Sequence, residues 1–299
     1  MTVAINLAEL PPPEVIQSLD FEVVLQSYKD KLLELFPDAA DVIELESEPL
    51  VKLMQLAAWR EMLLTARYND EARALLLAYA TGATLDHVAF TYYRRETRLV
   101  ITDADPEAIP PVEEVLESDD DFRNRVALKL ESYSTAGPTE AFIYHARSAS
   151  GQVKDASCTS PEEGTTLVTV LSREGNGVPS QPVLDAVIAR LTDGNVRPLS
   201  EEVLVQAATI VEYELTVSIY TYAGPDYSIV LADAEAEVAK YQESHHRLGH
   251  DHTISGLHAA AQRPGVQKVV LSIADDIAVN EFQAAYCTNL VVQHAGLAV

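Results

Sequence analysis

The stretch SDDDFRNRVALKLESYSTAGPTEAFIYHARSASGQVKDASCTSPEEGTTLVTVL, residues 118–171, decides the fold prediction. Ser118 followed by Asp121 three residues later has the form of a capping box, which marks the start of a helix. Apolar residues then recur on one helical face, at Phe122, Val126, Leu130 and Tyr133. The pattern therefore predicts a helix that begins near residue 118.

The second half of the stretch changes from helical to extended patterning. Pro138 stands where a first helical turn tolerates it, with Glu140 in the same turn, so a second helix follows at once. Gly151 ends that helix. The runs 153–159 and 165–171 are rich in β-formers and flank the turn-forming SPEEG. The stretch predicts two helices followed by a β-hairpin.

The N-terminal third is predicted to be helical, with more apolar surface than its own helices can bury. Three consecutive prolines near the start favour an extended arm. Helices are predicted over 13–36, from Pro49 onward and over 71–80, and the second of them is apolar over most of its circumference. A tight local core and a bundle shared with other subunits both explain this. The second explanation predicts interface residues at Pro11, Pro12, Pro13, Leu50, Leu53, Met54, Leu56 and Trp59.

The rest of the chain predicts two small mixed modules. Helices are predicted from Ser180 and over 229–245 and 255–262, and strands over 209–222 and 266–273. The tail beyond Phe282 has one apolar run at 290–292 and no other signal. A weak echo between 141–159 and 257–272 suggests that the modules are related. The fold class expected is α+β: an N-terminal arm and helical region (1–98), a proline-containing acidic linker (99–117), a central α+β domain (118–208) and a C-terminal α+β domain (209–299).

Composition points to protein partners. The chain has 299 residues with 46 acidic and 21 basic side chains, a net charge of −25. Such a charge repels nucleic acid, and an acidic surface also serves plain solubility. No apolar run approaches the ~20 residues that span a bilayer, and no N-terminal signal pattern is present. The two cysteines indicate buried thiols in a reducing compartment.

Motifs for enzymatic chemistry are missing from the sequence. There is no nucleophile elbow and no glycine-rich phosphate loop, so no catalytic residue and no cofactor are expected. One cluster offers an alternative: the sequence HHRLGHDH, with His245, His246, His250, Asp251 and His252, contains ligand types that hold zinc. The alternative function is thus a metal-binding enzyme or sensor. Gly249 is expected to break the helix between these histidines, which favours a solvated turn.

The sequence of residues 118–171 resembles that of a known protein family. The series D-x-F-R-x-R, Y-S-x-A-G-P, Y-x-A-R-S-A, V-x-D and S-P-x-x-G, all within residues 118–171, is similar to the baseplate J family of contractile phage tails and R-type bacteriocins. Further matches are found along nearly the whole chain: LPPPEVI (10–16), LDFE (19–22), LESEP (45–49), ATGxxLD (80–86), VRPLS (196–200), HRLG (246–249) and GVQKV (265–269).

The resemblance implies a structural, non-enzymatic subunit of the tail baseplate wedge. Family members are thought to pair with each other, to bind a smaller wedge protein of the baseplate I type through their N-terminal helices, and to close a six-fold ring around the hub. The implied partners are a second copy, that smaller wedge protein and other baseplate and hub proteins, with neither nucleic acid nor membrane. The implied location is the virion tail baseplate, after synthesis in the host cytoplasm.

Overall fold

Residues 15–134, 137–198, 201–224 and 226–297 are described by the computed structural model, and they fall into two compact units. The N-terminal unit lies within residues 3–97, and the C-terminal unit runs from Arg98 to Val299. Helices dominate the first unit, while the second contains both helices and three small sheets. The α+β fold class is therefore confirmed.

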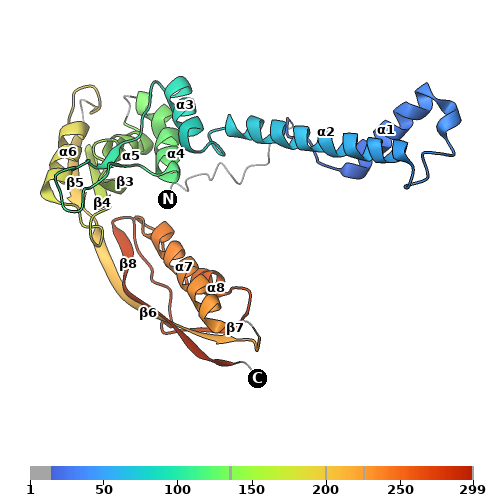
Figure 1. The fold of residues 1–299 in the computed structure, drawn as a ribbon. Helices are drawn as coiled ribbons and strands as arrows, with labels where there is room; N and C mark the ends of the chain where they lie inside the picture. Colours follow the sequence, from blue (N-terminus) through green and yellow to red (C-terminus); the bar gives the residue numbers. More distant parts are fainter. Residues whose placement is uncertain (1–14, 135–136, 199–200, 225, 298–299) are drawn as a thin grey trace. The chain divides into compact units, whose positions relative to one another are not determined.

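The N-terminal unit is built on one long helix. Its elements are α1 (Phe21–Leu35), the short 3-10 helix η2 (Pro37–Ala39), α2 (Pro49–Ala74) and α3 (Gly82–Tyr92). Asp20 caps α1 by accepting from the backbone N–H groups of Glu22 and Val23. Pro49 occupies the first turn of α2, where its missing N–H costs nothing. Figure 1 shows α1 lying alongside the first half of α2, and their shared core contains Leu25, Ile43, Val51, Met54 and Ala58.

The segment before α1 is fixed to the second half of α2 by one buried amide. Asn69 accepts from the backbone N–H of Gln17 at 3.0 Å and donates to the Gln17 carbonyl at 2.8 Å. A buried amide is stable only when its polar groups are paired, and here both are. The chain therefore runs along α2 before it turns into α1.

The C-terminal unit begins with a small hairpin and the central module. The elements are β1 (Val100–Thr102), β2 (Val115–Leu116), α4 (Asp119–Ala127), η3 (Leu128–Tyr133), α5 (Thr139–Arg147), β3 (Val153–Glu162), β4 (Thr165–Ser172), α6 (Gln181–Leu191) and β5 (Glu202–Ala207). Ser118 caps α4 by accepting from the N–H of Asp121, as the capping box predicts. The sheet order is β3-β4-β5, with β4 antiparallel to β3 and parallel to β5. Helices α5 and α6 pack on this sheet around Phe142, Val170 and Val187.

The C-terminal module contains a second three-stranded sheet. Its elements are β6 (Thr209–Thr221), α7 (Tyr227–His245), α8 (Ile254–Ala261), β7 (Val266–Leu271) and β8 (Gln283–Leu297). The order is β7-β6-β8, so again the central strand has one antiparallel and one parallel neighbour. Strands β6 and β8 run beside each other as a long curved ribbon, with α7 and α8 packed over it (Figure 1).

Several expectations differ from the structure. The helix predicted over 13–36 begins only at Phe21, and the helix predicted from residue 118 continues after Ala127 as the 3-10 helix η3. The helix predicted over 71–80 is the continuation of α2, which ends at Ala74 because Leu75–Ala80 form turns. Residues 99–117, predicted to be a linker, contain the paired strands β1 and β2. The tail, in which the sequence shows only a short apolar run, forms the 15-residue strand β8. Strand β8 lacks regular alternation of polar and apolar residues at its start, where both Ala284 and Ala285 are buried.

Candidate interaction surfaces

Helix α2 has two apolar faces, and only one of them is covered within the N-terminal unit. Val51, Met54 and Ala58 follow helical spacing on the face that packs on α1. On the opposite face Leu53 and Leu56 are 63% and 59% exposed, and Trp59, one turn further on, is 54% exposed. Leu63 continues the row, also exposed. An exposed apolar row of this length on a helix is typical of a protein contact site.

Basic side chains lie along this exposed row, although the chain as a whole is strongly acidic. Lys52, Arg60 and Arg67 are all exposed, and their spacing puts them beside the leucines. Arg67 pairs with Glu71 of the same helix at 2.8 Å. The face therefore suits a partner helix that is apolar in its centre and acidic at its margin.

The predicted interface residues are divided among three environments. Leu50, Leu53, Leu56 and Trp59 are exposed on α2. Met54 is only 8% exposed because it packs against α1, so it supports the helix pair. Pro11, Pro12 and Pro13 lie outside the described residues. Leu63 and the basic residues were not predicted, although Leu63 is seven positions, two helical turns, beyond Leu56.

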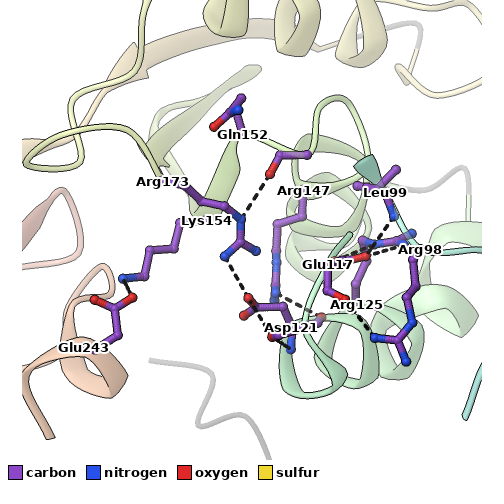
Figure 2. A network of polar contacts seen from close by, with 12 residues as sticks. Arg98, Leu99, Glu117, Asp121, Arg125, Arg147, Gln152, Lys154, Arg173 and Glu243 are labelled. Carbon is purple, nitrogen blue, oxygen red and sulfur yellow. Dashed lines mark hydrogen bonds and ion pairs between the residues drawn. The ribbon is translucent and has the colours of Figure 1, made fainter. Parts of the chain in front are cut away.

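At the start of the C-terminal unit, a buried ion pair ties the β1–β2 hairpin to α4. Arg125 donates to both carboxylate oxygens of Glu117, with the shortest distance 2.8 Å from Nη2 to Oε2. Both side chains are buried. Figure 2 shows Arg98 approaching the same place from the other side, where it donates to the Glu117 carbonyl at 2.7 Å and pairs with Asp119 at 2.6 Å. Arg98 is thus paired with polar groups of the same unit.

A second part of the network connects α4 to the sheet. Arg173, just after β4, pairs with Asp121 at 2.7 Å and donates to the carbonyl of Gly151 (Figure 2). Burial alone would raise the pKa of Asp121, but Arg173 and Arg147 hold that pKa below its usual value. Burial in turn lowers the pKa of Arg147, and the charges of Asp155 and Asp121 oppose this shift. These charges are paired and internal, and they act as structural supports.

The central and C-terminal modules meet through a small apolar cluster with polar contacts around it. Leu171, Ala208, Leu248 and Ala284 form the cluster. The side chain of Asp155 accepts from the Leu248 N–H at 3.2 Å, and Lys154 pairs with Glu243 at 2.5 Å. Gly177 permits the close approach, because a Cβ there would lie 2.6 Å from Leu171 Cδ1 and 2.9 Å from His246 Nε2. The two modules are thus held together as one unit.

Two histidines of the metal-binding alternative, His246 and His252, make packing contacts within the C-terminal unit. His246 is buried and its Nδ1 donates to the Ala285 carbonyl at 2.8 Å, while His252 is buried with Nδ1 2.5 Å from the Tyr213 hydroxyl. Burial lowers the pKa of His252 to about 4 and also lowers the pKa values of His246 and His250. Within the described residues, no three His, Cys, Asp or Glu side chains are placed to hold a metal ion. The alternative therefore has no geometric support.

Burial raises the pKa of both cysteine thiols. Cys158 and Cys287 are free and half-buried. Burial raises the pKa of the Cys158 thiol to about 12, with Glu201 and Glu140 adding to the effect, so it stays protonated.

None of the described helices is long and apolar enough to span a membrane.

Taken together, these features suit a protein that contacts other proteins through an exposed apolar helix, while its internally paired charges support its own fold. Comparison with known proteins agrees. Residues 46–105 match the model of the baseplate J-like N-terminal domain, and residues 134–207 match that of the baseplate J-like central domain. A curated relative, baseplate protein J of Escherichia phage P2, is 42% identical over 298 residues, which is 98% of each chain. The class is that of structural proteins of the contractile phage tail baseplate.

This chain belongs to the baseplate J-like family. Among solved structures, a chain of the six-fold symmetrised cryo-EM structure of the anti-feeding prophage baseplate is similar, with a TM-score of 0.40 and 14% identity. The similarity covers 60% of this chain and 46% of the solved one. The resemblance to the family that the sequence motifs indicate is confirmed.

Proposed function

We propose that this chain is a wedge subunit of a tail baseplate, which binds a smaller wedge protein of the baseplate I type through the exposed face of α2. Membership of the baseplate J-like family supports a structural role in contact with other baseplate proteins. The single observation that carries the binding site is the exposed row of Leu53, Leu56 and Leu63 opposite the covered face of the helix.

In this function the N-terminal unit docks and the C-terminal unit forms the body of the subunit. Self-pairing of such subunits around the central hub would build a six-fold ring in the virion tail. When the sheath contracts, the subunits would change their contacts as rigid bodies, a common form of switching in assemblies. No catalytic step is part of this proposal.

The test is co-expression of the full chain with the small wedge protein made beside it, followed by size-exclusion chromatography with light scattering. The variant Leu53→Gln/Leu56→Gln removes the centre of the exposed row without touching the α1 contact. We expect the complex to weaken at least about a hundredfold, since truncation of buried interface anchors costs ~2 kcal/mol or more each.

The matched control is Leu130→Gln, an equally exposed leucine in the C-terminal unit. It should bind like the unchanged protein. If the α2 variant binds as well as the unchanged chain, α2 is not the docking site. If the unchanged chain forms no complex with the small wedge protein, the proposed function itself is contradicted.

A further inference from the structure

Strand β8 has a free edge. It pairs with β6 on one side only, because it is the last strand in the order β7-β6-β8. At its start the edge is covered: the Gln283 carbonyl accepts from the Gly249 N–H, and the Ala285 carbonyl accepts from His246. From Leu290 to Leu297, within the described residues, β6 supplies the only partners of the β8 backbone. Unpaired strand edges are templates for pairing with another strand.

This edge also lacks the charged side chains and prolines that exposed edges often carry. No Asp, Glu, Lys, Arg or Pro occurs from Phe282 to Val299, which is the longest uncharged run in the sequence. Proteins blunt edge strands with charges and prolines, and charged residues are frequent elsewhere in this chain. An edge without them is suited to pairing rather than protected against it.

The charge distribution favours a second copy of this chain as the partner. With a net charge of −25, two copies repel each other over most of their surfaces. If the β8 strands of two copies paired, however, no acidic side chain of one strand would face an acidic side chain of the other. A neutral contact line is therefore where two such acidic subunits can approach at least cost.

The sequence of the regular part of β8 is self-complementary in antiparallel pairing. Between its irregular positions at Thr288 and Ala295, β8 keeps steady register with β6. If Val291 lies on a two-fold axis, it faces itself, while Asn289 faces Gln293 of the other copy on the exposed side of the sheet. Leu290 then faces Val292 of the other copy on the side that packs on the core. Amide pairs with amide and apolar with apolar, which is what an isologous contact requires.

We propose that the free edge of β8 is a homotypic docking site, where β8 of a second copy adds antiparallel and is centred on Val291. Between the irregular positions at Thr288 and Ala295, such a ladder would contain roughly four to six backbone hydrogen bonds. The inference builds on the self-pairing in the proposed function and gives it a surface in the C-terminal unit, separate from the α2 face.

The test uses the full chain and measures self-association by sedimentation velocity over a range of concentrations. Val291 is 39% exposed, so V291K and V291E should fold while they place like charges opposite each other. We expect each variant alone to dimerise at least about tenfold more weakly than the unchanged chain, and an equimolar mixture of the two to recover a dimer.

The matched control is V270K, because Val270 is 41% exposed and lies on β7, the opposite edge of the same sheet. It should leave dimerisation unchanged. A chain that stays monomeric at all concentrations, a dimer insensitive to V291K, or a mixture that does not recover would each overturn the proposal. A monomer that instead binds an extended segment of another protein at β8 would overturn the second copy as partner. Binding of the small wedge protein through α2 is unaffected by any of these results.

Discussion

The pair of Glu117 and Arg125 shows how single residues organise this chain. Glu117 directly precedes the cap of α4, and Arg125 lies two turns into that helix, where it also packs over the Phe122 ring at 5.3 Å. The carboxylate receives two nitrogens of Arg125 and the backbone N–H of Leu99. A buried carboxylate with this many donors is stable only while all of them remain. The hairpin, the cap and the helix therefore depend on one another through this pair.

Removal of one partner should be far more harmful than removal of both. Arg125→Ala leaves Glu117 buried without its charge partner, and we expect the free energy of unfolding of the C-terminal unit to fall by about 3–5 kcal/mol. The double variant Glu117→Leu/Arg125→Met removes the unpaired charge and should recover most of that loss. Urea denaturation followed by circular dichroism measures both.

The control for this pair is Arg67→Ala, which breaks the exposed Arg67–Glu71 pair on α2. Exposed pairs contribute little, so stability should not change. Equal losses for the buried and the exposed arginine would contradict the structural role of the network.

At the scale of elements, the sequence predicts local signals well and long-range pairing poorly. The cap at Ser118 and the hairpin that follows α5 depend on neighbouring residues, and the structure reproduces them. Gly151, predicted to end α5, lies beyond the end of that helix at Arg147 and instead contacts β1 closely. Strand β8 has no clear signal in the sequence because polar and apolar residues do not alternate regularly at its start, and its pairing with β6 joins residues that lie some seventy positions apart. Excess apolar surface predicts an exposed apolar face on α2, but the sequence alone cannot separate Met54 from Leu53, since only the position of α1 decides which face is covered.

The contact of the β1–β2 hairpin with the central module depends on a glycine. A Cβ on Gly151 would lie 2.0 Å from the backbone oxygen of Val100, so any side chain forces the two backbones apart. Gln152 donates to the Ile101 carbonyl at 2.7 Å in the same contact. We expect Gly151→Ala to lower the free energy of unfolding by about 1–3 kcal/mol, measured by thermal or urea denaturation.

Gly194 provides the matched control, because a Cβ there meets nothing within 4 Å and its backbone is not in the left-handed region. Gly194→Ala should be neutral or stabilise the protein by up to about 1 kcal/mol through the unfolded state. If Gly151→Ala were equally harmless, the close approach of β1 would not contribute to stability.

At the scale of the whole molecule, the boundary between units lies at Thr97 and Arg98, ahead of the proline-containing stretch. The prolines and acidic residues of 99–117 predict a linker. Its backbone, however, is tied into the C-terminal unit by β1, β2 and the bonds of Arg98 to Glu117 and Asp119. A short hairpin of this kind is specified by tertiary contacts that local composition does not reveal.

Two truncated chains should therefore differ in thermal stability, although neither contains the helical N-terminal unit. A chain of residues 98–299 keeps every contact described for the C-terminal unit, and we expect it to unfold cooperatively with a Tm within a few degrees of that unit in the full protein. A chain of residues 112–299 lacks β1 and Arg98, so the Glu117 carbonyl and Asp119 lose charged donors that contribute about 1.5–3 kcal/mol each. For a unit of this size that loss lowers the Tm by on the order of 10 °C. Differential scanning calorimetry measures both chains, and equal Tm values for the two would place residues 98–111 outside the folded unit and restore the linker interpretation.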